Sequence, residues 1–428
     1  MLQEQCLWSV TAPKTHDYEA LTCDSQTAVC IIGGGYTGLS AAIHLAEKGV
    51  KVVLLESQTI GSGGSGKSVG LVNAGTWARP DDLGISLGAE KGEGLTKALG
   101  AAPSLVFDLI KRYAIDAQAT QAGNLHMAHN AKGEADVDIR YEQLIRRGAN
   151  VEVLSGSKCH EYCGTTSINK ALLDHRAGTI NPLAYVRGLA KVAEQLGVII
   201  HEHSAVNALE KSDNEWYVRT SQANIKAERV IIATNAYTEG EWTEIRKTFY
   251  SVSYYQIASE PLTGEMAEQI LPHRNGAWDT RLALSSFRRD NDNRLLLGTV
   301  GGRACKPKQF YQSWANYVQK SYYPYLPKFS WQYEWYGTFG FTKDHIFRVL
   351  EPDEGILTAT AYNGRGITTG TLMGKCFADY ILTGDRSSIP LPFKTLAESE
   401  VRFPALKSGA TELGLTLYHA GQCLRIIK

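Results

Sequence analysis

The sequence predicts a mixed α/β protein in which a dinucleotide-binding domain is joined to a second domain with its own sheet. A short βαβ unit lies near the N-terminus, and strands and helices alternate again from about residue 177 to 236. Residues 250–341 have a different sequence pattern, with strand-like segments and many aromatic side chains. The length of 428 residues also exceeds the size at which one hydrophobic core usually stops growing.

The composition is that of an ordinary globular protein. The 44 Lys and Arg residues balance the 44 Asp and Glu residues, and hydrophobic residues make up 43% of the chain. This balance argues against nucleic acid as a partner, because such binding needs a basic surface that neutralises phosphates. No uninterrupted apolar run approaches the roughly 20 residues that span a bilayer.

The eight cysteines are scattered, and the N-terminus has no signal-peptide apolar stretch. We therefore expect free thiols and a cytoplasmic protein. Cys159 and Cys163 form the one close pair, but no second pair of ligands follows at a zinc-site distance. No metal site is predicted.

Residues 28–56 make up the βαβ unit. An apolar strand over 28–32 runs into a glycine-rich turn at 33–38, a helix follows over 39–48, and 51–55 is a second apolar strand. This brevity matches the approximately 30 residues of a dinucleotide-binding crossover.

The turn in this unit has the spacing that phosphate binding requires. Gly33 permits a tight turn, Gly35 lets the backbone approach a pyrophosphate, and Gly38 lets the helix pack closely on the sheet. Tyr36 and Thr37 stand in this turn, and the N-terminus of the helix that follows faces the phosphates, where its N–H groups and dipole favour negative charge.

Glu56 completes the nucleotide motif. It stands with Ser57 at the end of the second strand, where a carboxylate accepts hydrogen bonds from ribose hydroxyls. The turn and the carboxylate together predict dinucleotide binding, but they do not choose between FAD and NAD.

The remaining elements follow from the same periodicities. In chain order we expect a Gly/Ser-rich loop at 61–70, helices over about 83–113 and 182–196, strands at 198–203, 216–220 and 228–233, a helix near 309–320, a strand at 356–361 that enters a Gly-Arg-Gly turn, and a helix over 368–382.

Four remote segments favour FAD over NAD, because its isoalloxazine ring extends well beyond the adenosine and needs several loops to hold it. The expected contacts in these segments are Gly66, Lys67, Ser68, Val69 and Gly70 in the second glycine-rich loop, Val206 near a strand, Thr234 and Asn235 at a strand end, and Asn363, Gly364, Arg365, Gly366 and Ile367 in the C-terminal turn.

Together these segments resemble the D-amino-acid oxidase superfamily of FAD-dependent oxidoreductases, in the branch of glycine and sarcosine oxidases. The resemblance spans about residues 28–385, and Lys67-Ser68 departs from it, because relatives commonly carry Arg-Asn there. The segments that carry it are 31–38 with Glu56, 66–70, 176–182, 230–236 and 362–366.

The resemblance implies a division of the chain into discontinuous α/β and α+β parts. A Rossmann-like FAD-binding domain of the GR2 type would comprise 1–80, 160–240 and 336–390, an antiparallel-sheet substrate domain 81–159 and 241–335, and a C-terminal segment 391–428.

It also implies a reaction, in which a neutral amine passes hydride from its α carbon to flavin N5 and leaves as an imine. The first substrate expectation is L-pipecolate or a similar cyclic imino acid of lysine catabolism, favoured by the sequences at 70–75 and 125–129. The alternative is γ-glutamylputrescine or another amine. An NAD-dependent dehydrogenase and a flavoprotein that does not act on amines are the less favoured alternatives.

The side chains expected at the reaction centre come from several segments. Arg288 and Arg365 are candidates to bind a substrate carboxylate, because the planar guanidinium binds both oxygens, with a structural role as the alternative for each. Tyr254, or its neighbour Tyr255, would supply a hydroxyl. Lys67 would put positive charge near the flavin ring, with a solvated lysine as the alternative.

Three histidines, His126, His129 and His345, lie in stretches where a catalytic base is conceivable. A base is not required if the substrate binds with its nitrogen already neutral, so structural roles are favoured.

The flavin is expected to be noncovalent. Some sarcosine oxidases attach it through a cysteine late in the chain, but Cys376 lies ten residues after the Gly-Arg-Gly turn, inside a predicted helix.

Oxygen and a membrane quinone both remain open as electron acceptors. The segment 391–428 contains Arg402, Lys407, Arg425 and Lys428, and peripheral contact with the inner face of the cytoplasmic membrane is the alternative to packing on the body.

Overall fold

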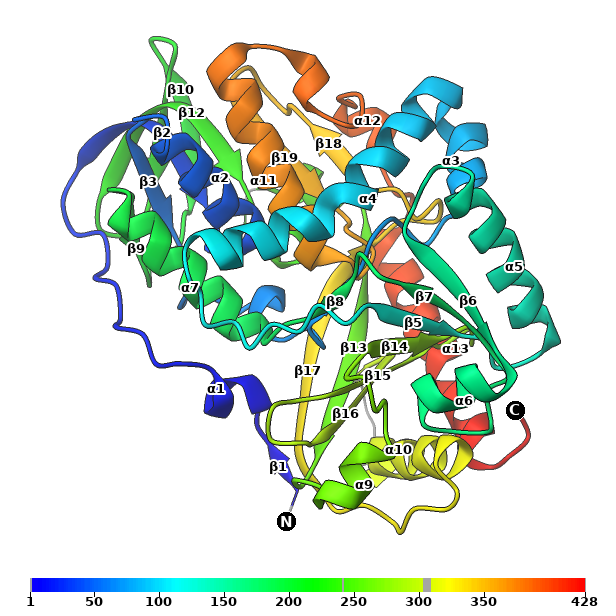
Figure 1. The fold of residues 1–428 in the computed structure, drawn as a ribbon. Coiled ribbons are helices and arrows are strands. Elements are labelled where there is room, and N and C mark those ends of the chain that lie inside the picture. The colour runs from blue at the N-terminus through cyan, green and yellow to red at the C-terminus, as the bar shows by residue number, and fades with distance from the viewer. Residues whose placement is uncertain (1, 241, 303–308, 428) are drawn as a thin grey trace.

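Two sheets organise the protein, one mostly parallel at its centre and one mostly antiparallel (Figure 1). The computed structural model describes residues 2–240, 242–302 and 309–427. The predicted combination of an α/β sheet with a second, antiparallel sheet is confirmed.

The first sheet has eight strands. Parallel pairing joins β12 to β2, β2 to β3 and β3 to β9, and β19 pairs with β12 on the same parallel pattern. All four residues of β3 are buried, as expected for a parallel strand covered on both faces. The strands are β10 (Ala208–Ser212), β11 (Glu215–Arg219), β12 (Asn224–Ile232), β2 (Ser25–Ile32), β3 (Val52–Leu55), β9 (Ile199–His201), β18 (Arg348–Leu350) and β19 (Ile356–Thr360).

The second sheet has nine strands, and most neighbouring strands in it are antiparallel. A two-stranded ribbon, β4 (Leu71–Val72) and β8 (Gly178–Thr179), lies apart from both sheets. The order in the second sheet is β1 (Gln3–Glu4), β17 (Trp331–Phe341), β13 (Tyr250–Ser259), β16 (Leu295–Val300), β15 (Ser285–Arg289), β14 (Gly276–Asp279), β5 (Asn124–Met127), β7 (Lys170–Asp174) and β6 (Val151–Ser155).

Helices cover both sheets, and α2, α7 and α11 lie side by side on one face of the first sheet (Figure 1). The helices of the described residues are α1 (Leu7–Thr11), α2 (Tyr36–Ala46), α3 (Pro80–Leu87), α4 (Ala89–Arg112), α5 (Ala131–Ile145), α6 (Gly156–Cys163), α7 (Pro182–Gln195), α8 (Thr243–Arg246), α9 (Gly264–Glu268), α10 (Gln309–Tyr322), α11 (Gly366–Thr383), α12 (Leu396–Ser399) and α13 (Pro404–Cys423).

Several predicted boundaries differ from the structure. The helix expected over 83–113 is two helices, α3 and α4, because Gly88 between them has φ +85°. Helix α2 begins at Tyr36, three residues before the expected start, because extended Gly35 is its N-cap. Val206 lies in the loop between β9 and β10, so the strand expected there begins later.

Sheet membership also departs from the predicted division. Strand β1 pairs with β17, and β7 pairs with β5 and β6, although both segments were assigned to the FAD-binding part. Helix α4, assigned to the substrate part, contributes Leu95, Leu99 and Val106 to the core shared with α2 and α11. Sequence periodicity indicates which face of an element is buried, but it does not indicate which sheet covers that face.

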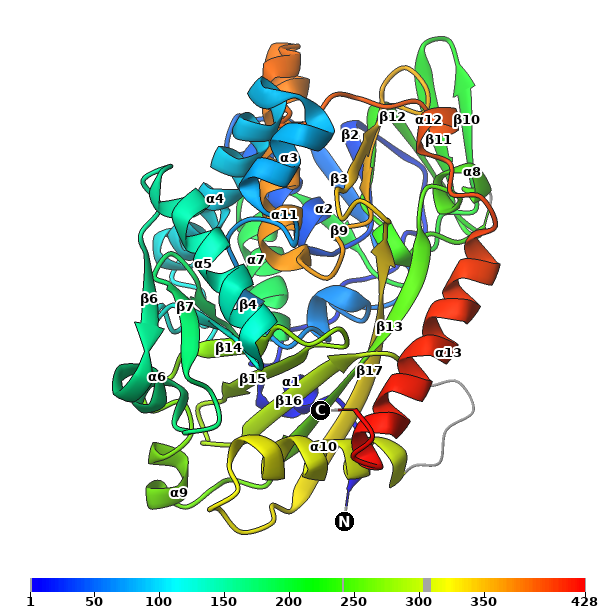
Figure 2. The same ribbon diagram turned by 90° about the vertical axis from the view of Figure 1, so that its right-hand side faces the viewer.

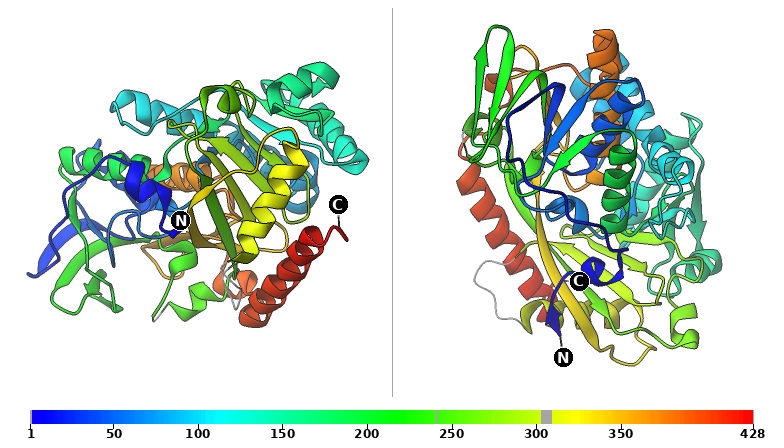
Figure 3. Two further views of the ribbon diagram at one scale, coloured as in Figure 1. Left: turned by 90° about the horizontal axis from the view of Figure 1, so that it is seen from below. Right: turned by 90° about the vertical axis from the view of Figure 1, so that its left-hand side faces the viewer.

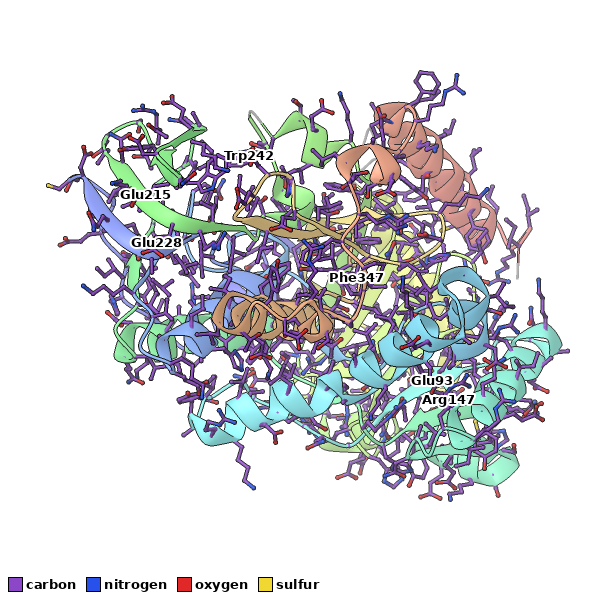
Figure 4. The ribbon with its side chains drawn as sticks, turned by 90° about the horizontal axis from the view of Figure 1, so that it is seen from above. Glu93, Arg147, Glu215, Glu228, Trp242 and Phe347 are labelled. Carbon is purple, nitrogen blue, oxygen red and sulfur yellow. The ribbon has the colours of Figure 1, made fainter. Side chains whose placement is uncertain are left out.

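Ion pairs connect the long helices on the surface. The Arg147 Nε lies 2.8 Å from the Glu93 carboxylate, which joins the end of α5 to α4; both side chains are labelled in Figure 4. Exposed pairs of this kind contribute little to stability.

No helix in the described ranges is long and apolar enough to cross a membrane. The C-terminal helix α13 packs on β13 and α10 along one side of the molecule (Figure 2). Among the same residues, no three His, Cys, Asp or Glu side chains come together as metal ligands. The seven cysteines described are free thiols, and Cys305 lies outside the described residues.

Helices α2 and α11 are in unusually close contact at Gly374. A Cβ there would collide with the Thr37 carbonyl and lie 2.6 Å from the Ser40 Cβ. We expect Gly374→Val to lower the free energy of unfolding by about 1–3 kcal/mol. Gly94→Ala on the exposed face of α4, where a Cβ meets nothing within 4 Å, is expected to raise it by about 0.5–1 kcal/mol. Denaturant titration measures both, and equal effects of the two substitutions would contradict close packing at Gly374.

Candidate active site

A cavity of about 1220 Å³ lies between the two sheets. Loops at the carboxyl ends of the parallel strands form one half of its wall, and one face of the antiparallel sheet forms the other. Ligands of open α/β sheets bind at the carboxyl ends of the strands. The predicted cofactor contacts that line it are Gly33, Gly35, Tyr36, Thr37, Glu56, Ser57, Lys67, Ser68, Val69, Gly70, Val206, Thr234, Asn235, Asn363, Gly364, Gly366 and Ile367.

Two further predicted glycines, Gly38 and Gly66, support the wall without lining it. A Cβ on Gly38 would collide with the carbonyl of Gly33, and one on Gly66 would collide with the carbonyl of Gly61. Both glycines therefore act by letting backbone segments approach closely.

The βα turn has the geometry that its sequence predicts. Gly33 has φ +110°, and a Cβ on Gly35 would lie 2.8 Å from the Ser65 hydroxyl. The Glu56 carboxylate accepts hydrogen bonds from the Gly34 N–H and the Gln58 N–H, both at 2.9 Å, and also lines the cavity. The turn and carboxylate therefore fit the diphosphate and ribose of a dinucleotide.

The second glycine-rich loop is fixed by donors to its carbonyl oxygens. The Trp8 indole donates to the Ser68 carbonyl and the Trp335 indole to the Lys67 carbonyl, each at 2.8 Å. Ser68 lines the cavity, and its buried hydroxyl lies beside the Tyr36 hydroxyl.

Arg288 belongs to this support and does not line the cavity. Its Nη1 donates to the carbonyls of Val69 and Gly70 at 3.3 Å and to that of Ile180, and its guanidinium lies over the Trp8 ring. Burial lowers its pKa to about 10. The expectation that it binds a substrate carboxylate is therefore corrected: the side chain is buried and its donors serve backbone carbonyls.

The side chain of Arg365 also points away from the main cavity. It donates to the Ala74 carbonyl at 2.7 Å, and its guanidinium lies 4.6 Å from the ring centre of Trp77 and 5.3 Å from that of Trp278. Burial, with the charge of Arg140, lowers its pKa to about 9. The expected direct roles of Arg365 in cofactor and carboxylate binding are corrected, because the two tryptophans stand in front of it.

The two predicted asparagines hold the turn that leads into α11. The Asn235 side-chain oxygen accepts from the Ala361 N–H, and that of Asn363 accepts from the Thr342 N–H, each at 2.8 Å. Ala361 and Asn363 have φ +63° and +52°, in the left-handed region. Their hydrogen bonds stabilise a costly backbone conformation at the cavity wall.

A row of side chains crosses the antiparallel sheet beneath the cavity. Gln256 of β13 and Ser286 of β15 both pair in register with Gly298 of β16, and Trp278 of β14 pairs with Ser286 and with His126 of β5. Neighbours in register share a face, and these four side chains line the cavity. A Cβ on Gly298 would overlap the Gln256 amide and lie 2.5 Å from the Ser286 hydroxyl.

Tyr254 lies two residues before Gln256 and therefore on the same face of β13. Its hydroxyl and the Gln256 side-chain oxygen are buried with no partner in the protein. Burial raises the pKa of Tyr254 well above its ordinary value, so this phenol remains a hydrogen-bond donor. Tyr255 faces the opposite side and donates to the Glu334 carboxylate, so its expected role at the reaction centre is corrected.

The three histidines all line the cavity. His126 stacks on Trp278 with ring centres 3.6 Å apart, and burial holds its pKa well below the ordinary value. Burial also lowers the pKa of His129 and of His345. The three imidazoles are therefore uncharged at neutral pH.

Two arginines in the cavity wall form ion pairs with carboxylates that also line it. The Arg140 Nε lies 2.6 Å from Asp136, and the Arg281 Nη1 lies 2.8 Å from Asp279. Lys67, on the second glycine-rich loop, has no ion pair with a described residue.

The sequence analysis did not identify Gln256, Ser286, Trp77 or Trp278. The alternation of side chains along β13 indicates that Gln256 shares the face of Tyr254. The positions of Ser286 and Trp278 beside Gln256 follow instead from the order of strands in the sheet. That order joins strands far apart in the chain, so no local pattern contains it.

The βα turn, Glu56 and the cavity beside them have the geometry expected of a dinucleotide-binding protein. The family model described as FAD dependent oxidoreductase matches residues 28–380. This chain belongs to that family, and the predictions of FAD and of an FAD-dependent oxidoreductase are confirmed.

Individual relatives agree with this assignment. Gamma-glutamylputrescine oxidoreductase of Escherichia coli (strain K12) is 32% identical over 374 residues, which cover 86% of this chain and 85% of that protein. Glycine oxidase of Geobacillus kaustophilus (strain HTA426) is 21% identical over 82% of this chain and 92% of that protein.

Solved structures share the fold at low identity. Glycine oxidase from Geobacillus kaustophilus has a TM-score of 0.68 at 19% identity, covering 88% of this chain and 99% of that one. L-proline dehydrogenase from P. horikoshii has a TM-score of 0.72 at 17% identity, covering 89% and 100%.

A substitution of Glu56 tests whether this end of the cavity binds the ribose of FAD. We expect Glu56→Ala to weaken FAD binding by about ten- to a hundred-fold, because hydrogen bonds to a charged group contribute about 1.5–3 kcal/mol. Titration of the apoprotein with FAD, followed by flavin fluorescence, measures the affinity. Glu228→Ala, at an exposed position of β12 labelled in Figure 4, serves as control. Unchanged affinity in Glu56→Ala would contradict a ribose contact.

Proposed function

We propose that this enzyme oxidises the C–N bond of an amino or cyclic imino acid, with L-pipecolate or a similar ring compound as substrate. One observation carries the proposal: Gln256 and Tyr254 line the cavity, and the Gln256 side-chain oxygen and the Tyr254 hydroxyl lack hydrogen-bond partners in the protein. An acceptor and a donor on one face of β13 match the N–H and the carboxylate that such a substrate carries on one carbon.

Each group has a defined task in this proposal. The Gln256 oxygen accepts a hydrogen bond from the neutral substrate nitrogen, and Tyr254 donates to a carboxylate oxygen. Lys67 contributes positive charge to the same cavity. In a site closed to water these hydrogen bonds are stronger than in solution, so they orient the substrate.

The aromatic wall favours a compact ring. Trp77 meets Trp278 edge to face with ring centres 5.0 Å apart, and Trp278 stacks on His126. The Trp77 indole donates to the Asn363 carbonyl at 2.5 Å, which fixes its orientation. Flat apolar surfaces bury the CH₂ groups of a saturated ring while the polar row binds its nitrogen and carboxylate.

The cofactor contacts named above would hold FAD, with the α2 turn and Glu56 at its nucleotide end. When bound, FAD supplies the flavin ring that accepts the hydride from the carbon next to nitrogen. Cys376 is buried in α11 and is not among the residues that line the cavity, which supports noncovalent attachment. Lys67 would stabilise negative charge that develops on the ring.

A second candidate substrate is γ-glutamylputrescine or a related amine. It is supported by the 32% identity to the Escherichia coli protein named gamma-glutamylputrescine oxidoreductase. Such an amine has no carboxylate on the reacting carbon, so Tyr254 would have a different partner.

The cellular setting is part of the same proposal. We place the reaction in the cytoplasm, with oxygen or a membrane quinone as the electron acceptor.

Anaerobic flavin reduction distinguishes the substrates. We expect L-pipecolate to bleach the flavin absorbance of the purified holoenzyme faster than γ-glutamylputrescine, L-proline and ordinary amino acids. Rates from stopped-flow absorbance give the ranking. If γ-glutamylputrescine alone reduces the flavin, the order of the two candidate substrates is reversed. If none of these compounds reduces it, the proposed oxidation of a C–N bond is contradicted.

Variants of Tyr254 test whether this side chain contributes to the preference for a substrate with a carboxylate. Tyr254→Phe should lower kcat/KM for the carboxylate substrate by about tenfold or more and leave that for a simple amine nearly unchanged. Tyr217→Phe on β11, away from the cavity, is the matched control. An equal loss for both substrate types would point to structural damage.

The pH dependence should follow the substrate nitrogen. The lowered pKa values of His126, His129 and His345 leave them neutral above their ordinary range, so none gains a base function between pH 7 and 10. We expect kcat/KM to rise about tenfold per pH unit toward an amine pKa of about 10. The raised pKa of Tyr254 predicts no falling limb in that window. A plateau of kcat/KM above about pH 6.5 would indicate a histidine base if His126→Asn abolishes it. His16→Asn, at an exposed position, is the control and should leave the profile unchanged.

A further inference from the structure

The C-terminal helix α13 exposes a row of leucines to solvent. Leu406, Leu413, Leu417 and Leu424, which follows the helix directly, are 71%, 62%, 63% and 71% exposed. Their spacings of seven, four and seven residues place them on one face of an α-helix. Six of the fifteen large apolar side chains exposed in the described part of the chain lie between residues 403 and 426. Single exposed leucines are ordinary, but a continuous row indicates a binding surface.

The opposite face of α13 is already packed, so the row is not a core face lacking its protein partner. His419 is fully buried, and its Nε2 lies 2.8 Å from the Val300 carbonyl. The Glu412 carboxylate accepts from the Ser253 N–H at 2.7 Å and the Gly302 N–H at 2.9 Å. These contacts fix the rotation of the helix, which runs along the edge of the molecule (Figure 3), and the exposed leucines therefore face solvent.

The ends of the row carry positive charge. Arg402, Lys407 and Arg425 are exposed, and Glu412, the only acidic residue from 402 to 427, is turned inward. Phe403 and Ile426 extend the apolar surface at 60% and 76% exposure. Apolar side chains flanked by basic ones are the pattern of helices that lie in the surface of an anionic membrane.

A second copy of the chain fits this surface less well. In a twofold pairing of α13 with itself, antiparallel helices would place Arg402 and Lys407 opposite Arg425, and parallel helices would place each basic residue opposite itself. Both arrangements set like charges against each other, whereas anionic lipid head groups neutralise all of them.

The same helix reaches the cavity. Thr411, Leu415 and Tyr418 line it, and the Tyr418 hydroxyl contacts the backbone of Leu282, which lines the cavity while 83% exposed. A surface that binds the outer face of α13 is therefore close to an apolar part of the cavity rim.

We propose that α13 is an interfacial helix that docks this protein onto an anionic lipid surface, with Leu406, Leu413, Leu417 and Leu424 inserted among the acyl chains and the flanking basic side chains at the head groups. This surface is independent of the identity of the substrate.

Vesicle sedimentation tests the proposal with the full-length holoenzyme. We expect binding to vesicles of phosphatidylglycerol mixed with phosphatidylcholine, at least tenfold weaker binding to phosphatidylcholine alone, and loss of binding at high salt. Leu413→Glu/Leu417→Glu should lower the affinity by at least about tenfold, because two buried leucines are lost. Lys407→Glu/Arg425→Glu should lower it by about fivefold per charge or more.

Ile85→Glu is the matched control, because Ile85 is 85% exposed on α3, across the molecule from α13 in Figure 2. Flavin absorbance of each variant checks that it is folded, and light scattering measures its mass. A wild-type protein that does not sediment with anionic vesicles would overturn the proposal. A wild-type dimer that Leu413→Glu/Leu417→Glu converts to monomer would assign the surface to self-association instead.

Discussion

The cavity depends on the hydrogen bonds that hold the carbonyl groups of the second glycine-rich loop. A loop rich in glycine loses much conformational freedom on folding, and its buried carbonyls need donors. Trp8, Trp335 and Arg288 supply them, reaching the carbonyls of four consecutive residues from 67 to 70. Arg288 and Trp335 come from the antiparallel sheet and Trp8 from the N-terminal helix, so this loop joins the two halves of the molecule.

A second constraint is the close approach of α2 and α11. Gly374 permits it, and the Ser40 hydroxyl donates to the Thr371 carbonyl across the contact at 2.7 Å. As a result both helices begin at the cavity, α2 at Tyr36 and α11 at Gly366. Two helix N-termini directed to one cavity favour a ligand with negative charge or strong acceptor groups, as a flavin dinucleotide has.

The end of the cavity that we propose for the substrate differs from the end that contains the βα turn and Glu56. Its acids are paired with arginines, its histidines are held neutral by burial, and its orphaned groups are an amide oxygen and a phenol. Orientation by neutral hydrogen bonds suits a reaction that needs an uncharged nitrogen. Arg288 and Arg365, the side chains that chemical reasoning first suggests for a carboxylate, instead stabilise the walls.

The sequence by itself determined the nucleotide half of the site. The turn at 33–38 and Glu56 form a pattern within one βαβ unit of about 30 residues, so the sequence shows it without knowledge of the rest of the fold. Tertiary structure alone decided the other half. The row from Gln256 to His126 exists because β13 pairs in register with β16, and β14 with β5 from more than a hundred residues earlier in the chain. Arg365 is shielded because two tryptophans from distant segments meet in front of it. Sequence records which face of an element is buried, whereas the partner that buries it is chosen by packing of the whole chain.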